Sequence, residues 1–339
     1  MNMKQWVETV INATEKKAIP VLSFPCISLM EITVNDLIND SDLQAKGMKL
    51  VADKVPTGAS VSMMDLSVEA EAFGSTIRFS DDEVPTVIGK IVDDEDAADA
   101  LEVPEVGAGR TGKYIEAIEK VCRMITDRPV LAGIIGPFSL AGRLMDVSEA
   151  MINCYEEPDM VHTVMKKTAQ FLTEYAKAYK AVGANGIVMA EPLTGLLSPD
   201  LAREFSAPYV KEIIDAVQDE NFAVIYHNCG NNVIRMVDSI IGVGAYGYHF
   251  GNSITMSDII DKIPSDALVM GNVDPAGQLR NGTPASIKAE TKRIMEACCS
   301  NPNFVISSGC DIPPASSWEN IEAFFEAVGE FYLEKKKAQ

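Results

Sequence analysis

One histidine and two cysteines are the residues of this chain best suited to metal chemistry. His227 and Cys229 are two positions apart in the apolar run AVIYHNCG (223–230), and Cys310 ends the run FVISSGCD (304–311). On an extended strand, side chains two apart point the same way. Two thiolates and an imidazole suit a catalytic zinc site with an open fourth position. A single buried cysteine is usually a small hydrophobe, so the coincidence of HxCG and GC at two strand ends is what favours zinc.

Four more polar residues end other apolar runs. Glu191 is a candidate fourth zinc ligand or general acid/base, with a salt-bridged rim carboxylate as the alternative. His249 is a candidate substrate contact, although a histidine in a core is more often only hydrogen-bonded. Asp65 is a candidate catalytic residue, and it and Asp274 are candidate hydrogen-bond acceptors for a substrate.

These residues need a scaffold that brings distant strand ends together. Eight short apolar runs alternate with helical segments, a pattern typical of a (β/α)₈ TIM barrel, whose active site is built from the carboxyl ends of the strands. The predicted strands are 18–25, 58–65, 130–138, 186–192, 223–230, 245–251, 267–274 and 304–311. The predicted helices in the second half are 158–182, 200–219, 232–240, 255–263, 284–299 and 317–335. Residues 66–112 do not fit the repeat and are interpreted as an insertion after strand 2 that covers part of the barrel mouth.

Composition restricts the class of protein. The chain has 339 residues, enough for one large core, and we expect a single domain over 1–339. Its formal charge of −20 opposes binding to nucleic acid and to anionic membranes. We find no membrane-length apolar run and no secretory signal, and the seven cysteines are an odd number, so buried thiols or metal ligands are favoured over disulfides. These features predict a cytoplasmic protein.

Four motifs carry a resemblance to a known family. The stretches YHNCGNN (226–232), SSGCDIPP (307–314), AEPLTGLLSPD (190–200) and GPFSLAG (136–142) resemble the uroporphyrinogen decarboxylase superfamily. Within it, the chain looks like the zinc-dependent corrinoid methyltransferases that methylate coenzyme M, and the resemblance covers nearly the whole chain. It implies that His227, Cys229 and Cys310 bind zinc.

The resemblance also implies a mechanism and partners. A thiol would bind the open zinc position as thiolate and attack the methyl group of a methyl-corrinoid. A separate corrinoid protein would carry that co-substrate, because this chain has no D-x-H-x-x-G corrinoid motif. Arg143, soon after the third strand, is the candidate for binding an anionic acceptor such as coenzyme M. A homodimer is possible by analogy with the decarboxylases.

Two alternatives stay open at this point. One is a metal-free decarboxylase-like lyase in which Asp65 polarises the substrate; the stretch GNVDP (271–275) resembles the decarboxylase pattern. Decarboxylases, however, bind substrate carboxylates with arginines near the first strand, and here the first arginine is Arg78. The other alternative is a non-catalytic barrel with a structural zinc ion that serves as a partner of corrinoid proteins.

Overall fold

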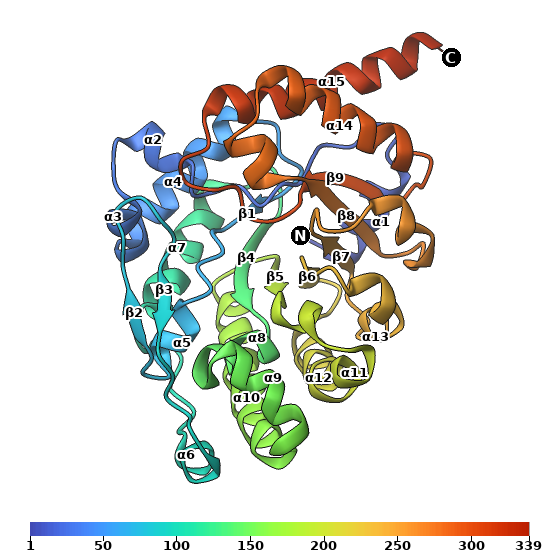
Figure 1. Cartoon of the computed structure of the whole chain (residues 1–339). Coiled ribbons are helices and arrows are strands. Elements are labelled where there is room, and N and C mark those ends of the chain that lie inside the picture. The colour runs from blue at the N-terminus through green and yellow to red at the C-terminus, as the bar shows by residue number, and fades with distance from the viewer. Residues whose placement is uncertain (339) are drawn as a thin grey trace.

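A single curled sheet of parallel strands forms the centre of the protein, and helices cover its outer face (Figure 1). The computed structural model describes residues 1–338. Over these residues the main sheet has seven strands in the order β1-β4-β5-β6-β7-β8-β9, which is consistent with a TIM-barrel-like fold. The strands are β1 (Ser60–Val61), β4 (Val130–Ile135), β5 (Gly186–Ala190), β6 (Ala223–Asn228), β7 (Gly247–Phe250), β8 (Leu268–Val273) and β9 (Phe304–Ser308).

The strand predicted over 18–25 is not a strand in the structure, so that part of the prediction is wrong. Its backbone forms one hydrogen bond to β9, from Ile19 to Ile306 (3.1 Å), and accepts one from Gly58, just before β1 (2.8 Å). Two residues further on, the side chain of Ser308 accepts the backbone N–H of Val21 (3.1 Å). Because side chains replace part of the backbone ladder, the segment contacts both edges of the sheet without becoming a regular strand.

Alternation along the strands separates two cores. Residues on one face pack with the helices, whereas alternate residues fill the space enclosed by the sheet. Helix α1 (Met3–Asn12) contributes to this inner core at the amino ends of the strands. The inner core contains Met3, Val7, Ile19, Val21, Ala59, Val61, Met64, Leu131, Val188, Ala190, Ala223, Ile225, Leu268, Met270 and Val305. On β6 the inward positions Ala223 and Ile225 are followed by His227, so the polar site begins where this apolar filling ends.

The segment between β1 and β4 contains a small antiparallel hairpin, β2 (Thr76–Arg78) with β3 (Thr86–Ile88). Its acidic part includes a short helix, α6 (Glu95–Ala100), whose first turn Asp94 caps by accepting from Ala97 (2.8 Å). The segment also contains α5 (Val68–Ala72) and is followed by α7 (Thr111–Met124).

The remaining helices lie in the connections between strands. Before β1 these are α2 (Cys26–Met30), α3 (Val34–Asn39) and α4 (Ser41–Lys54); after β4 they are α8 (Pro137–Met145), α9 (Val147–Glu156) and α10 (Pro158–Ala181). After β5 come η1 (Leu193–Leu196), α11 (Pro199–Phe205) and α12 (Ala207–Val217), and after β6 come η2 (Val233–Met236) and α13 (Val237–Ile241). After β8 come the π-helical turn η5 (Pro275–Arg280) and α14 (Pro284–Cys298), and α15 (Trp318–Ala338) ends the chain. Within residues 1–338, no helix combines the length and apolar character needed to cross a bilayer.

The prediction of a helix over 255–263 is also wrong. The β7–β8 connection forms only two 3₁₀ turns, η3 (Met256–Asp258) and η4 (Ile260–Lys262), with hydrogen bonds between residues three apart. Pro264 disfavours helical geometry at the residue before it, which shortens any helix here.

Candidate metal centre

The three predicted ligands converge at the carboxyl ends of β6 and β9. One ligand atom from each of His227, Cys229 and Cys310 lies within 4.8 Å of the other two. His227 Nε2 is 3.5 Å from Cys310 Sγ. In tetrahedral zinc sites with Zn–S bonds of about 2.3 Å, neighbouring ligand atoms are about 3.8 Å apart. The donor set and its spacing therefore fit a zinc ion after small side-chain movements.

Glycines let the loops that carry these ligands approach closely. A Cβ on Gly251, just after β7, would lie 2.5 Å from Cys229 Cβ, and a Cβ on Gly309 would lie 2.8 Å from the backbone nitrogen of Asn252. A side chain at either position would collide with the neighbouring loop. The loops after β6, β7 and β9 are thus packed against one another, which holds the two cysteines over the same end of the sheet.

The two thiols influence each other's pKa. The neighbouring Cys310 thiol lowers the pKa of Cys229, and Cys229 in turn raises the pKa of Cys310. Thiolate is the form of cysteine that binds metal ions.

His249 lies behind His227, inside the sheet. Its Nδ1 is 2.6 Å from His227 Nδ1, and its Nε2 is 2.7 Å from Ser307 Oγ. Burial lowers the pKa of His249 well below its usual value. The predicted contact of this histidine with substrate stays a prediction; in the structure it contacts the metal-ligand candidate itself. Ser307 was missed from the sequence, although alternation with the inward Val305 on β9 indicates its direction.

Glu191 is buried at the end of β5 and contacts the start of helix α8. Its carboxylate accepts hydrogen bonds from the backbone of Phe138 (2.7 Å) and Ser139 (3.1 Å) and from the hydroxyls of Ser139 (2.8 Å) and Thr194 (3.0 Å). Burial raises the pKa of Glu191 to about 7, against the opposing effect of these hydrogen bonds. Its oxygens lie outside the three-residue ligand cluster, and among residues 1–338 the carboxylate has no ion-pair partner. Its role as ligand or acid/base stays a prediction.

Asp65 belongs to a buried network at the start of the β1–β4 segment. It forms an ion pair with Arg110, whose side chain is 4% exposed, and accepts hydrogen bonds from Tyr114 Oη (2.8 Å) and from Ser67 Oγ (2.6 Å) and N (3.1 Å). Arg110 also pairs with Glu71 (2.6 Å). The network joins the end of β1 to the start of α7. The catalytic role predicted for Asp65 stays untested by this arrangement.

The other two predicted residues lie apart from the ligand cluster. Asp274 follows β8 and caps the turn η5, accepting from the backbone of Ala276 (2.9 Å) and Gly277 (2.8 Å). Arg143 lies on α8, where its Nε is buried without a hydrogen-bond partner in the described part of the chain, and burial lowers its pKa. Their predicted substrate contacts stay predictions.

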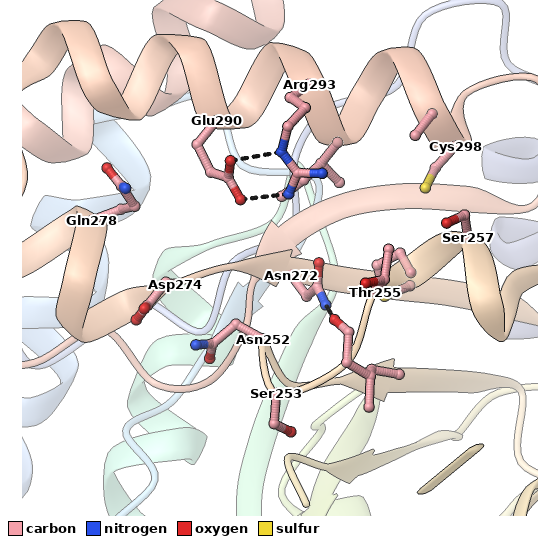
Figure 2. Close-up of a pocket in the computed structure, with 14 residues that line it drawn as sticks. Asn252, Ser253, Thr255, Ser257, Asn272, Asp274, Gln278, Glu290, Arg293 and Cys298 are labelled. Carbon is pink, nitrogen blue, oxygen red and sulfur yellow. Dashed lines mark hydrogen bonds and ion pairs between the residues drawn. The ribbon is translucent and has the colours of Figure 1, made fainter. Parts of the chain in front are cut away.

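A polar pocket of about 350 Å³ lies between the β7–β8 connection and α14. Figure 2 shows Asn252, Asn272 and Asp274 on one side and the ion pair Glu290–Arg293 of α14 on the other. One lining residue contacts the cluster's backbone: Ser253 Oγ donates a hydrogen bond to the carbonyl of Cys229 (2.7 Å), although His227, Cys229 and Cys310 are not among the residues that line the pocket. This pocket was not foreseen from the sequence.

Comparison with known proteins places this arrangement in a family. The family model for uroporphyrinogen decarboxylase (URO-D) matches residues 10–331, nearly the whole chain and all of the candidate site. The chain belongs to the URO-D family. The resemblance inferred from the four motifs is thereby confirmed at the level of the family.

Relatives within the URO-D family include two kinds of enzyme. The methylcobamide:CoM methyltransferase MtbA of Methanosarcina acetivorans is 27% identical over 271 residues, covering 78% of this chain and 77% of the relative. A uroporphyrinogen decarboxylase of Alcanivorax borkumensis is 26% identical over 307 residues, covering 87% and 85%. A solved methyltransferase structure from Methanosarcina mazei has a TM-score of 0.85 at 23% identity and covers 98% of this chain and 99% of that one, which shows a shared fold.

Proposed function

We propose that this URO-D family member is a zinc-dependent methyltransferase that moves a methyl group from a methyl-corrinoid to a thiol such as coenzyme M. The observation that carries the proposal is the convergence of His227, Cys229 and Cys310 within 4.8 Å at one end of the sheet. The similarity to MtbA supports it, because that relative is a methylcobamide:CoM methyltransferase. As the co-substrate's source we propose a corrinoid protein, and as compartment the cytoplasm.

The proposed chemistry needs a thiolate at neutral pH. Zinc held by the three ligands would supply a Lewis acid that stabilises a bound thiolate. The residues of the chain provide a site with three protein donors, which leaves a fourth position for the acceptor. We further propose that one of the two substrates binds in the polar pocket, because Ser253, which lines it, hydrogen-bonds to the backbone carbonyl of Cys229.

Glu191 and Arg143 complete the proposed site in different ways. Burial raises the pKa of Glu191 to about 7, so this carboxyl is able to hold or release a proton near neutral pH. Arg143 has a buried nitrogen with no partner in the described part of the chain and is proposed to pair with an anionic acceptor group. His249, Asp65 and Asp274 are proposed substrate or catalytic contacts of lower priority, because each is already hydrogen-bonded within the protein.

The architecture that we propose for this function is a (β/α)₈ barrel in a single domain over 1–339. The segment 18–25, which bonds to β9 and to Gly58 before β1, would take the place of the first strand. Residues 66–112 would be an insertion beside the mouth of the barrel. A homodimer is part of the same proposal, by analogy with the decarboxylases.

The proposal is tested by zinc content and methyl transfer in one experiment. The purified zinc-loaded protein is mixed with methylcobalamin and coenzyme M, and loss of the methyl–cobalt absorbance is followed. Loss of a residue that only hydrogen-bonds to a metal ligand lowers activity or metal affinity roughly 10- to 100-fold. Because Cys310 is itself a proposed ligand, we expect Cys310→Ala to lower both activity and zinc affinity by more than this. The matched control is Cys154→Ala, which removes a buried cysteine of α9 outside the ligand cluster.

The same assay separates the rival functions. If Cys310→Ala retains both zinc and thiol methylation, the site assignment is wrong. A wild-type protein that binds no zinc and consumes uroporphyrinogen would instead be a decarboxylase, as several relatives are named. A protein that binds zinc tightly and methylates no thiol with methylcobalamin or a methylated corrinoid protein would support the structural-zinc alternative.

A further inference from the structure

A chain of hydrogen bonds runs from the candidate ligand His227 across the inside of the sheet. His227 Nδ1 is 2.6 Å from His249 Nδ1, His249 Nε2 is 2.7 Å from Ser307 Oγ, and Ser307 Oγ is 2.8 Å from the carbonyl oxygen of Ile19. The chain joins β6, β7, β9 and the irregular segment after α1. His249 and Ser307 are 1% and 0% exposed, so bulk water does not compete for these bonds.

The direction of the bonds follows from the atoms at the far end. A carbonyl oxygen only accepts, so Ser307 donates its hydroxyl proton to Ile19. Ser307 Oγ then accepts from His249 Nε2–H, and in the neutral ring this leaves His249 Nδ1 as an acceptor. His227 Nδ1 must therefore carry the proton that lies between the two rings.

A second contact fixes the same direction independently. The carbonyl oxygen of His249 is 3.2 Å from His227 Nδ1, and this oxygen also only accepts. Both neighbours of that nitrogen thus require an N–H group on it. The unprotonated nitrogen of His227 is then Nε2, the atom that lies 3.5 Å from Cys310 Sγ.

We infer that His249 and Ser307 are positioning residues that hold His227 with Nε2 free to bind the metal. The inference rests on the metal centre of the proposed function, but not on the identity of its substrates. A histidine ligand is stronger when its other nitrogen donates to an oriented partner, because the ring is held in place and its basicity rises. Neither residue belongs to the ligand cluster, so the inference assigns neither of them a chemical step.

The competing interpretation is that these residues only fill the interior with satisfied polar groups. Neighbouring serines on β9 distinguish the two interpretations. Ser308 is as buried as Ser307 and also bonds the irregular segment, by accepting from Val21 N (3.1 Å), but it lies on the opposite face of the strand and has no link to His227. Each of Ser307→Ala and Ser308→Ala therefore removes a side-chain bond to the irregular segment, and only the first also removes the bond to His249.

The experiment measures metal binding without any methyl transfer. Zinc affinity is determined by competition with a chromophoric chelator, and the cobalt-substituted proteins are compared by their thiolate-to-cobalt and ligand-field absorption bands. We expect Ser307→Ala to weaken zinc binding about tenfold and to shift the cobalt bands, since outer partners contribute roughly 10- to 100-fold. Ser308→Ala should bind zinc and give cobalt bands as the wild type does, and Ser307→Thr should restore most of the affinity.

Variants of His249 provide a second test in case Ser307→Ala fails to fold. His249→Asn keeps an acceptor oxygen near the place of Nδ1, whereas the similarly sized His249→Leu keeps none. We expect His249→Leu to lose at least ten times more zinc affinity than His249→Asn.

The possible outcomes distinguish a failure of the positioning role from a failure of the metal centre. Equal zinc affinities and identical cobalt spectra for Ser307→Ala and Ser308→Ala, or for the two His249 variants, would overturn the positioning role. A wild-type protein that binds neither zinc nor cobalt at the cysteines would overturn the metal centre itself, and with it the proposed function.

Discussion

Replacement of Asp65 by Asn decides whether this buried carboxylate serves the structure or the chemistry. The change keeps the shape of the side chain but removes the negative charge beside Arg110, whose side chain is 4% exposed. Breaking a buried ion pair by removing one partner costs about 3 to 5 kcal/mol. Glu71 still pairs with Arg110 (2.6 Å), so the lower value of about 3 kcal/mol is expected.

This free energy converts into a measurable change in Tm. At about 2.1 cal/mol/K per residue, a chain of this length has an unfolding entropy of about 0.7 kcal/mol/K, so Tm should fall by about 4 °C. Thermal unfolding followed by circular dichroism measures it. In the double variant Asp65→Asn/Arg110→Met, part of the loss should be recovered, because no buried guanidinium is left with only one of its two carboxylate partners.

An exposed ion pair supplies the control. Asp200→Asn removes a charge that pairs with Arg203 at the surface, and it should change Tm by less than about 1 °C. If Asp65→Asn also melts within 1 °C of the wild type but loses thiol methylation, the carboxylate acts on the substrate and the structural reasoning is refuted.

Three further predictions concern pH, the pocket and the metal. Burial raises the pKa of Glu69 from about 4.5 to about 7, so the folded state holds a proton that the unfolded state has lost; stability should fall as pH rises from about 4.5 to about 7. Glu69→Gln should match the wild type at pH 4.5 and be more stable at pH 8, by on the order of 3 kcal/mol in chemical denaturation, and equal stabilities at pH 8 would contradict the assignment. Ala297→Trp should obstruct the pocket and raise KM for one substrate with little change in kcat, whereas Ala289→Trp, elsewhere on α14, should not; identical steady-state kinetics would exclude the pocket as a substrate-binding site. Removal of zinc with a strong chelator should abolish methyl transfer, and added zinc should restore it; activity that survives complete removal, checked by metal analysis, would exclude a catalytic metal.

Much of the candidate site was predictable from local patterns. The alternation of AVIYHNCG predicts that His227 and Cys229 face the same way, and the final residues of FVISSGCD predict that Cys310 lies at a strand end. Parallel strands end on one side of a sheet, so the meeting of these residues required only the correct order of elements. The buried strands of the second half were equally visible as short runs rich in Val, Ile and Ala.

The two predictions that failed did so for different reasons. Whether 18–25 becomes a strand depends on whether the two sheet edges offer it backbone partners, and Ser308 provides a side chain instead. The apolar spacing of 255–263 suits a helix, but the connection before Pro264 forms 3₁₀ turns, so there the deciding signal was local.

By itself, the sequence determined which residues are able to bind a metal and on which strands they lie, because residue type and alternation are local properties. Only the tertiary structure decided which residues form hydrogen bonds or ion pairs with the polar residues of the site. Asp65 and Arg110 are 45 positions apart, and Ser307 is 58 positions from His249. Such partners are selected by three-dimensional packing, and the protonated nitrogen of His227 is set by a carbonyl oxygen of Ile19 that lies far away along the chain.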